Sequence, residues 1–284
     1  MPLLGAHVSI AGGLAQAIHR GEKLRCDAIQ IFTQSSLTWQ PSKLTETDIT
    51  AFRTAWKEAR WVRRVAAHNS YLLNLSTRDS KLRRQSVNLF IHILHQCEAL
   101  GIESLITHPG SHRGAGLQSG IDATARSLNE VLKACPGFRT RILLENTAGQ
   151  GDCIGSQFEE LYAIVSHTRA PESIGFCFDT QHAFAAGYDL REPAGYEAVF
   201  SEWDRLLGVA KIQAFHLNDA VKGLGSRVDR HANIGSGLLG RTPFRLLIED
   251  RRFGQTPMYL ETAPGENDAG HKRDLRILRS FLTR

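Results

Sequence analysis

The sequence lacks any Cys-x-x-Cys pair and has only five cysteines, Cys26, Cys97, Cys135, Cys153 and Cys177. An odd number without paired spacing argues against a disulfide framework and against a thiolate zinc site. No apolar run reaches the roughly 18 residues that cross a bilayer. The first residues, MPLLGAHVSIAGG, lack the basic region and long apolar core of a signal peptide. We therefore expect a cytoplasmic protein without membrane contact.

Low-complexity stretches and composition breaks are also missing, so we expect one domain over residues 1–284. Hydrophobic residues make up 42% of the chain, which is enough for a sizeable core. The formal charge of +5 is mildly basic. This charge suits a polyanionic partner such as nucleic acid, but it is common among soluble enzymes as well.

Short apolar runs alternate with longer amphipathic segments. The expected strands are residues 3–8, 28–32, 65–68, 104–108, 141–145, 174–179, 212–216 and 257–261. The expected helices are residues 48–60, 81–100, 119–134, 156–166, 193–207, 242–250 and 266–282. This alternation predicts an α/β protein with parallel strands, and eight of them favour a closed (β/α)8 TIM barrel. An open doubly wound sheet is the alternative.

Six of the expected strands end in a residue that can bind a metal. In a barrel, the carboxyl ends of all strands meet at one mouth, where active sites lie. A polar residue at one strand end could be accidental, whereas six in register favour a metal centre. These residues are His68, His108, Glu145, Asp179, His216 and Glu261.

Three more candidates follow strand ends or lie in a loop. His182 comes three residues after Asp179, so the pair could hold one ion or two different ions. Asp229 and His231 are two residues apart, and in an extended segment their side chains project to the same side. Nine imidazole and carboxylate ligands suit zinc, manganese or iron. Because a catalytic zinc takes about three protein ligands, nine indicate about three ions.

Other polar features near the expected mouth have less specific roles. His7 ends the first strand, His112 follows HPGS, and Asn218 lies in FHLND; we expect them to contact the ligands or a phosphate. GSGLLG, residues 235–240, matches a dinucleotide-binding pattern, but polar DRHAN precedes it in place of a buried strand. A phosphate-binding helix start remains possible there, since barrels often bind phosphate near their last loops.

Eight motifs occur in order between Gly5 and Thr262: GAHVSIAGGL, HNSYLLNL, ITHPGSH, LLENTAGQG, FCFDTQHAFAAGYD, FHLND, GSRVDRHANIG and LET. Together they resemble the endonuclease IV family of zinc-dependent apurinic/apyrimidinic endonucleases, which have a xylose isomerase-like barrel. The resemblance implies a hydrolase that cuts duplex DNA 5′ to an abasic site, leaving a 3′-hydroxyl and a 5′-deoxyribose phosphate. Removal of 3′-blocking groups is a further expected activity.

The resemblance also assigns the ligands to three zinc ions, for which Mn²⁺ could substitute. His68, His108 and Glu145 would hold the first ion, and Glu145 would bridge to a second ion bound by Asp179, His216 and Glu261. His182, Asp229 and His231 would hold the third. Asp179 and His182 would thus serve different ions. Among the ligands, we expect the chemistry to depend most on Glu145, Asp179, His182 and Glu261.

Loops after the strands supply the expected DNA contacts, namely Gln34, Trp39, Asn69, Tyr71, Leu72, Arg227 and Arg230. Tyr71 and Leu72 resemble the family's wedge into the base stack, although they could instead pack beneath their loop. The arginines could contact phosphates or remain solvated. Two positions depart from the family pattern: Leu37 replaces an arginine, and Gln181 replaces a cysteine. We expect the change at Gln181 to have little effect.

Two other functions are compatible with parts of the pattern. A sugar isomerase or epimerase on the same barrel would need one or two divalent ions, and the third ligand set argues against it. A DNA-damage binding module would recognise abasic duplex without turnover, and it would not need a complete ligand set. We expect the endonuclease to act on double-stranded DNA as a monomer.

Overall fold

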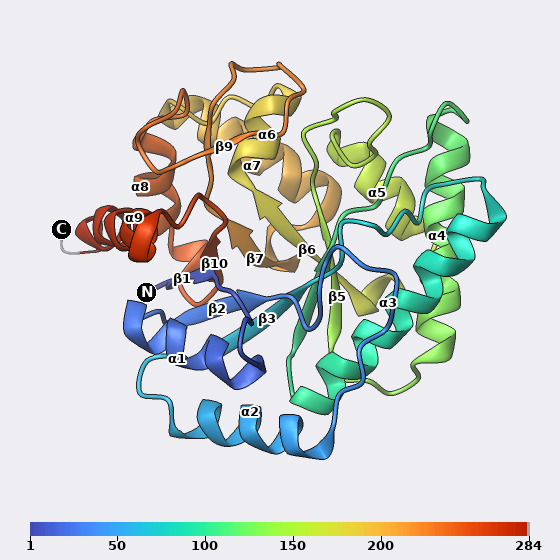
Figure 1. The fold of residues 1–284 in the computed structure, drawn as a ribbon. Coiled ribbons are helices and arrows are strands. Elements are labelled where there is room, and N and C mark those ends of the chain that lie inside the picture. Colours follow the sequence, from blue (N-terminus) through green and yellow to red (C-terminus); the bar gives the residue numbers. More distant parts are fainter. Residues whose placement is uncertain (283–284) are drawn as a thin grey trace.

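Eight parallel strands close into one barrel ringed by helices in the computed structural model, which describes residues 1–282 (Figure 1). Around the barrel the strands follow the order β1-β10-β7-β6-β5-β4-β3-β2. This closure confirms the TIM barrel and excludes the open doubly wound sheet. The strands are β1 Leu3–His7, β2 Ala28–Ile31, β3 Arg64–His68, β4 Ser104–Thr107, β5 Arg141–Glu145, β6 Ile174–Asp179, β7 Ile212–His216 and β10 Pro257–Leu260.

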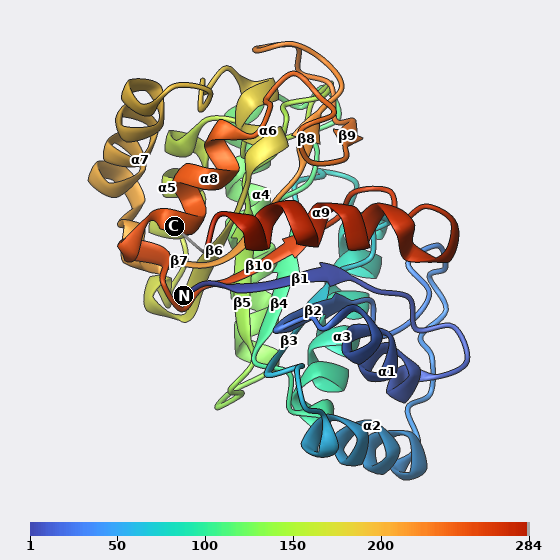
Figure 2. The ribbon, with the colours of Figure 1, turned by 90° about the vertical axis from the view of Figure 1, so that its left-hand side faces the viewer.

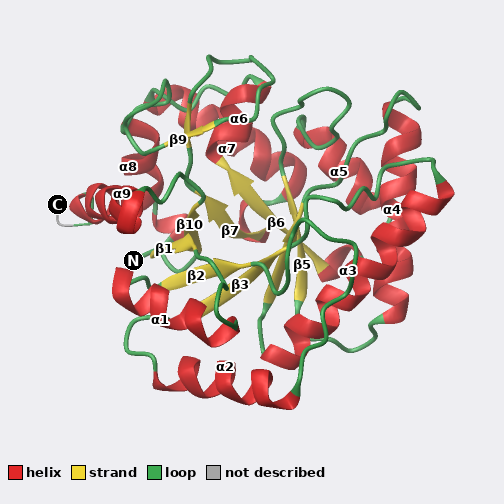
Figure 3. Cartoon of the chain, viewed as in Figure 1, coloured by secondary structure: helices red, strands yellow, loops and turns green. Residues whose placement is uncertain are grey.

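Helices follow the strands and pack around the outside of the barrel (Figures 2 and 3). The α-helices are α1 Leu14–Leu24, α2 Glu46–Glu58, α3 Ser80–Leu100, α4 Leu117–Ala134, α5 Phe158–Ser166, α6 Thr180–Ala186, α7 Pro193–Leu207, α8 Thr242–Glu249 and α9 Ala269–Ser280. Four 3₁₀ turns add η1 Pro171–Ser173, η2 Val209–Lys211, η3 Arg251–Phe253 and η4 Glu266–Asp268. Beyond the barrel, β8 Asp219–Ala220 and β9 His231–Ala232 form a short antiparallel ladder that anchors the long loop after β7.

All eight expected strands are present, with bounds that differ by one residue at most. Two helices, α1 and α6, were not predicted. Gly21 lies on the buried face of α1 and lowers its helix propensity, and a Cβ there would lie 2.6 Å from Ile29 Cγ2 and 2.8 Å from Val62 Cγ2. The close approach of α1 to the barrel therefore requires the residue that weakens its helical signal. In α6, the first six residues are all buried, so its sequence has no amphipathic period.

Two layers of buried side chains stabilise the barrel. A large cluster fills the space between strands and helices, and it includes aromatic residues such as Phe178, Phe200 and Trp203. A smaller cluster fills the barrel interior, where alanines stand beside one large ring, that of Tyr259. Burial of apolar surface stabilises the folded state by roughly 25 cal/mol per Å². The packed barrel therefore keeps the strand ends in fixed positions. Within residues 1–282, no helix is both long enough and apolar enough to span a membrane.

Candidate metal centre

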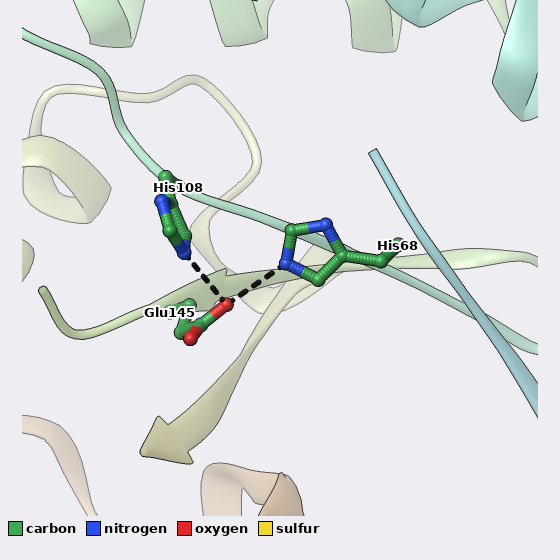
Figure 4. Close-up of side chains that lie close together, drawn as sticks. All are labelled: His68, His108 and Glu145. Carbon is green, nitrogen blue, oxygen red and sulfur yellow. Dashed lines mark hydrogen bonds and ion pairs between the residues drawn. The ribbon is translucent and has the colours of Figure 1, made fainter. Parts of the chain in front are cut away.

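Glu145 lies at the centre of a cluster of imidazoles at the carboxyl end of the barrel. It ends β5 and its side chain is fully buried. Its Oε2 lies 3.1 Å from His68 Nε2 and 3.1 Å from His108 Nε2, as Figure 4 shows. Its Oε1 lies 3.0 Å from His216 Nδ1 and 3.1 Å from His182 Nδ1. One carboxylate thus contacts four imidazoles that come from separate segments of the chain.

A second group shares Glu145 and adds three residues from the ends of β6, β7 and β10. His216 Nδ1 lies 3.2 Å from Glu261 Oε2 and 3.8 Å from Asp179 Oδ2. One ligand atom from each of Glu145, Asp179, His216 and Glu261 can be chosen so that all lie within 4.8 Å of one another. Carboxylate and imidazole donors at this spacing suit a divalent ion.

The third group is built from α6 and from the loop that leads into β9. Asp229 lies between two imidazoles, with Oδ2 at 3.4 Å from His182 Nε2 and Oδ1 at 3.3 Å from His231 Nε2. Asp179 also approaches this group, because its Oδ2 lies 4.0 Å from His231 Nε2. The geometry therefore places Asp179 between the second and third groups, and not in the second alone.

Asp179 also fixes where His182 lies, because it caps the helix that carries His182. Asp179 is the last residue of β6 and the N-cap of α6, and its Oδ1 accepts a hydrogen bond of 2.7 Å from the backbone N–H of His182. N-capping by aspartate is a local property of the sequence. The Asp-x-x-His spacing thus turns the chain from strand to helix and leaves Oδ2 directed at the other candidate ligands.

Backbone and side-chain oxygens orient three of the imidazoles. His68 Nδ1 lies 2.8 Å from the Asn69 carbonyl oxygen, and His182 Nδ1 lies 2.9 Å from the Asn146 carbonyl oxygen. His216 Nε2 lies 2.7 Å from Gln30 Oε1. Each oxygen can accept the proton of one ring nitrogen, so the other nitrogen faces a carboxylate with its lone pair. Metal-binding histidines are usually oriented in this way.

The burial and charge of these carboxylates and imidazoles indicate a binding site for a cation. Burial alone would raise the pKa of Glu145, but His216 and His108 hold it well below its usual range. Burial opposes ionisation of Glu261 as well, and His216 lowers its pKa to about 2. His231 Nε2 is buried and has no hydrogen-bond partner within the described residues. A buried nitrogen whose neighbours are the carboxylates of Asp229 and Asp179, at 3.3 and 4.0 Å, fits a metal ligand.

Gln30 belongs to this site, although it was not among the residues expected from the sequence. It lies on β2 with its side chain fully buried. Its Nε2 donates to Glu261 Oε1 at 2.7 Å and to His7 Nδ1 at 2.9 Å, while its Oε1 accepts from His216. Burial lowers the pKa of His7 to about 4, which agrees with a neutral ring that accepts this bond. The only indication of this role in the sequence is that Gln30 is the one polar residue within the apolar run AIQIF.

We expect Gln30→Leu to weaken metal binding at the second group. Leucine removes the amide that orients Glu261 and His216, and loss of such an outer partner typically costs about 10–100-fold in metal affinity. Competition with a chromogenic chelator measures this affinity directly. Gln213→Leu, on β7 and partly buried, is a matched control that should leave it unchanged. Equal affinities in Gln30→Leu and the parent protein would contradict the role.

Two further amides hold the loops that carry ligands. Asn218 donates from Nδ2 to Asp179 Oδ2 at 2.7 Å and accepts at Oδ1 from the Glu261 backbone N–H at 3.0 Å. Gln181 is fully buried, and its Nε2 donates to the Val228 carbonyl oxygen at 2.9 Å. It therefore connects α6 to the segment just before Asp229, a structural role at a position where the sequence led us to expect little effect.

The segment GSGLLG does not offer free amides for a phosphate. Asp219 is fully buried, and its carboxylate accepts hydrogen bonds from the backbone N–H groups of four residues of this segment. These are Gly235, Gly237, Leu239 and Gly240. An internal carboxylate already satisfies these donors of GSGLLG, and phosphate binding at the start of α8 that follows stays a prediction.

The expected DNA contacts differ widely in exposure. Tyr71 is 64% exposed, and Arg227 and Arg230 are exposed as well. Leu72 and Trp39 are partly buried. Gln34 and Asn69 are buried, and Gln34 Oε1 accepts from the Ser42 backbone N–H at 3.1 Å. The structure thus shows Gln34 holding its own loop, and a direct DNA contact by Gln34 or Asn69 stays a prediction.

His112 likewise contacts its own loop, because Nδ1 accepts from the Gly116 backbone N–H at 3.2 Å. A role for His112 at a phosphate stays a prediction.

Two adjoining cavities open at the mouth on either side of Tyr71. One, of about 380 Å³, is lined by His68, His108, His182 and Asp229. The other, of about 520 Å³, is lined by His7, Glu261 and Leu37, whose side chain is 80% exposed. Tyr71 lines both cavities. Candidate ligands are therefore accessible from solvent beside exposed apolar side chains.

Similarity to known proteins agrees with this geometry. Residues 18–281 match a family model described as a xylose isomerase-like TIM barrel. A relative from Geobacter sulfurreducens named "Probable endonuclease 4" is 44% identical over 99% of this chain and 95% of its own length. One of the same name from Chloroflexus aurantiacus is 43% identical over 99% of both chains. The crystal structure of endonuclease IV from Thermus thermophilus has a TM-score of 0.87 at 34% identity, covering 99% of both chains. This chain therefore belongs to the endonuclease IV family.

Proposed function

We propose that this protein is a DNA-repair endonuclease that hydrolyses the phosphodiester 5′ to abasic sites in duplex DNA. Its products would be a 3′-hydroxyl and a 5′-deoxyribose phosphate, and 3′-blocking groups would be further substrates. Residues 1–284 would act as one monomeric domain. The observation that carries the proposal is a third cluster, in which His182 and His231 lie close to Asp179 and also contact Asp229, beside the two groups that share Glu145. Clustered metals suit in-line displacement at phosphorus.

Three zinc ions would fit the three groups, with Glu145 shared between the first two and Asp179 lying between the second and third. When bound, zinc lowers the pKa of a water ligand to about 7 and offsets the charge that develops on phosphate. The chain itself would hold the ligands rigidly through Gln30, Asn146 and Asn218. No separate protein base is then needed near the scissile bond.

Exposed apolar side chains beside the ligands support binding of a damaged duplex. Tyr71 packs against Phe32 with ring centroids 5.3 Å apart and against His68 with ring centroids 6.1 Å apart. Two rings therefore hold the tyrosine in place while most of its side chain remains exposed to solvent. A missing base lowers the cost of extruding the nucleotide into a mouth lined by ligands. Tyr71, with the partly buried Leu72 beside it, would fill the space left in the base stack.

We expect Tyr71→Ala to weaken binding to abasic duplex by about tenfold, because a base–aromatic stack is worth roughly 1–3 kcal/mol. Binding to an undamaged duplex should change little. Fluorescence anisotropy with a duplex that carries an uncleavable linkage beside a tetrahydrofuran site measures both affinities. Tyr162→Ala, 52% exposed on α5, is the matched control. An equal loss on both duplexes would argue against a wedge.

Cleavage assays and metal counting on the same sample test the proposed function. The fully metal-loaded protein should cut a tetrahydrofuran-containing duplex and leave the undamaged duplex intact. Elemental analysis should give three zinc ions per chain. Tight binding without product would indicate a damage-binding module. One ion per chain, with conversion of a ketose or aldose and no cleavage, would indicate the isomerase alternative.

A further inference from the structure

A third cavity, of about 740 Å³, lies at the opposite end of the barrel from the candidate metal centre. Its lining includes the first residues of four strands, Arg64 of β3, Ser104 of β4, Arg141 of β5 and Pro257 of β10. Parallel strands start at one end of a barrel and finish at the other. None of the nine candidate ligands lines this cavity, and the nearest link between the two sites is the ring of Tyr259, whose centroid lies 6.5 Å from that of His216.

Arginines outnumber carboxylates in this cavity by four to two, the residues being Arg53, Arg64, Arg139, Arg141, Glu98 and Glu103. Arg64 has only a long contact, with Nε 3.9 Å from Glu103 Oε2. Within residues 1–282, the other three guanidinium groups make no hydrogen bond or ion pair. Glu98 is already engaged, since its Oε2 accepts from the backbone N–H groups of Arg139 and Thr140 at 2.9 and 3.0 Å. The cavity therefore has uncompensated positive charge.

Tyr259 adds a buried polar group to the lining. Its side chain lies in the barrel interior, where it is only 1% exposed, and it lines this cavity. Its hydroxyl has no hydrogen-bond partner among the described residues. The ring is buried in the barrel interior while the hydroxyl opens onto the cavity, where it can donate a hydrogen bond to a ligand.

We infer that this cavity binds a small, nucleotide-sized molecule that carries two phosphate groups. Its volume falls within the range of about 300–1,000 Å³ typical of small-molecule sites. Guanidinium groups bind phosphate through paired hydrogen bonds, and two phosphates would offset the excess of arginines. The Tyr259 hydroxyl would donate to the more deeply bound phosphate. A duplex backbone would reach the exposed arginines but not Tyr259.

Calorimetric titration of the metal-loaded, full-length protein with adenosine 3′,5′-bisphosphate tests the inference. We expect saturable binding at one site per chain. Arg141→Gln and Tyr259→Phe should each weaken it by about tenfold or more, because each removes a hydrogen bond to a charged group. Arg245→Gln, on α8, makes the same charge change elsewhere and should leave affinity unaltered. Abasic-duplex cleavage should stay unchanged in all three variants, so this test does not depend on the proposed function.

Several outcomes would overturn the inference. They include no saturable binding up to millimolar ligand, or equal affinity in the parent protein and in both Arg141→Gln and Tyr259→Phe. If only undamaged duplex DNA bound, and Arg141→Gln weakened it while Tyr259→Phe did not, the arginines would serve the DNA backbone instead. Thermal unfolding of each variant checks folding. Tyr259→Phe removes only one oxygen atom and should fold. If it does not, the affinity of Arg141→Gln alone tests the inference.

Discussion

Glu145→Gln is expected to abolish cleavage of abasic duplex, with a rate more than about 10³-fold below that of the parent protein. This loss exceeds the roughly 10–100-fold loss of activity that is typical when a residue hydrogen-bonded to a metal ligand is replaced. The amide keeps the shape of the side chain but loses the charge that four imidazoles surround. It would also present an N–H group where a ligand oxygen is needed. Because Glu145 belongs to two of the three ligand groups, the metal content should fall by one or two ions per chain. Cleavage rates and elemental analysis measure the two effects.

Glu159→Gln is the control for this change, since it neutralises an exposed carboxylate on α5. It should keep the parent rate and metal content. Thermal unfolding should show that Glu145→Gln remains folded, because the apolar clusters of the barrel are unaltered. A variant with full metal content and an undiminished rate would refute the shared role of Glu145.

His231→Ala should lose one metal ion and most activity, about 10²–10³-fold, as is typical when one stabilising group is removed from a transition state. His231 lies on the two-residue strand β9, outside the barrel, and it belongs only to the third group. The first two groups should therefore keep their ions, which separates this variant from Glu145→Gln. Elemental analysis on the same sample as the cleavage assay distinguishes the two patterns.

His19→Ala is the matched control, because His19 is exposed on α1. It should retain three ions and the parent activity. Full metal content in His231→Ala would show that this residue is not a ligand, and loss of all three ions would show that the groups do not bind independently.

Most of the barrel could be predicted because its strands are short apolar runs with polar residues at their carboxyl ends. β5, β6 and β7 have the predicted bounds. α1 was not predicted although its apolar residues have helical spacing, and Gly21, which lowers its helix propensity, is explained only by the close packing against Ile29 and Val62. The pairing of Gln30 with Glu261, 231 positions away, has no local signal at all.

Residue types and their order along the chain determined by themselves that a barrel mouth would gather nine imidazoles and carboxylates. The Asp-x-x-His cap was determined in the same way, because an N-cap depends on adjacent residues only. Only the tertiary structure decided that Asp179 lies between two groups, that Gln181 secures the Asp229 loop, and that Asp219 occupies the amides of GSGLLG. The physical reason is that distances between side chains of different strands depend on barrel closure and packing. Local sequence patterns do not contain these distances.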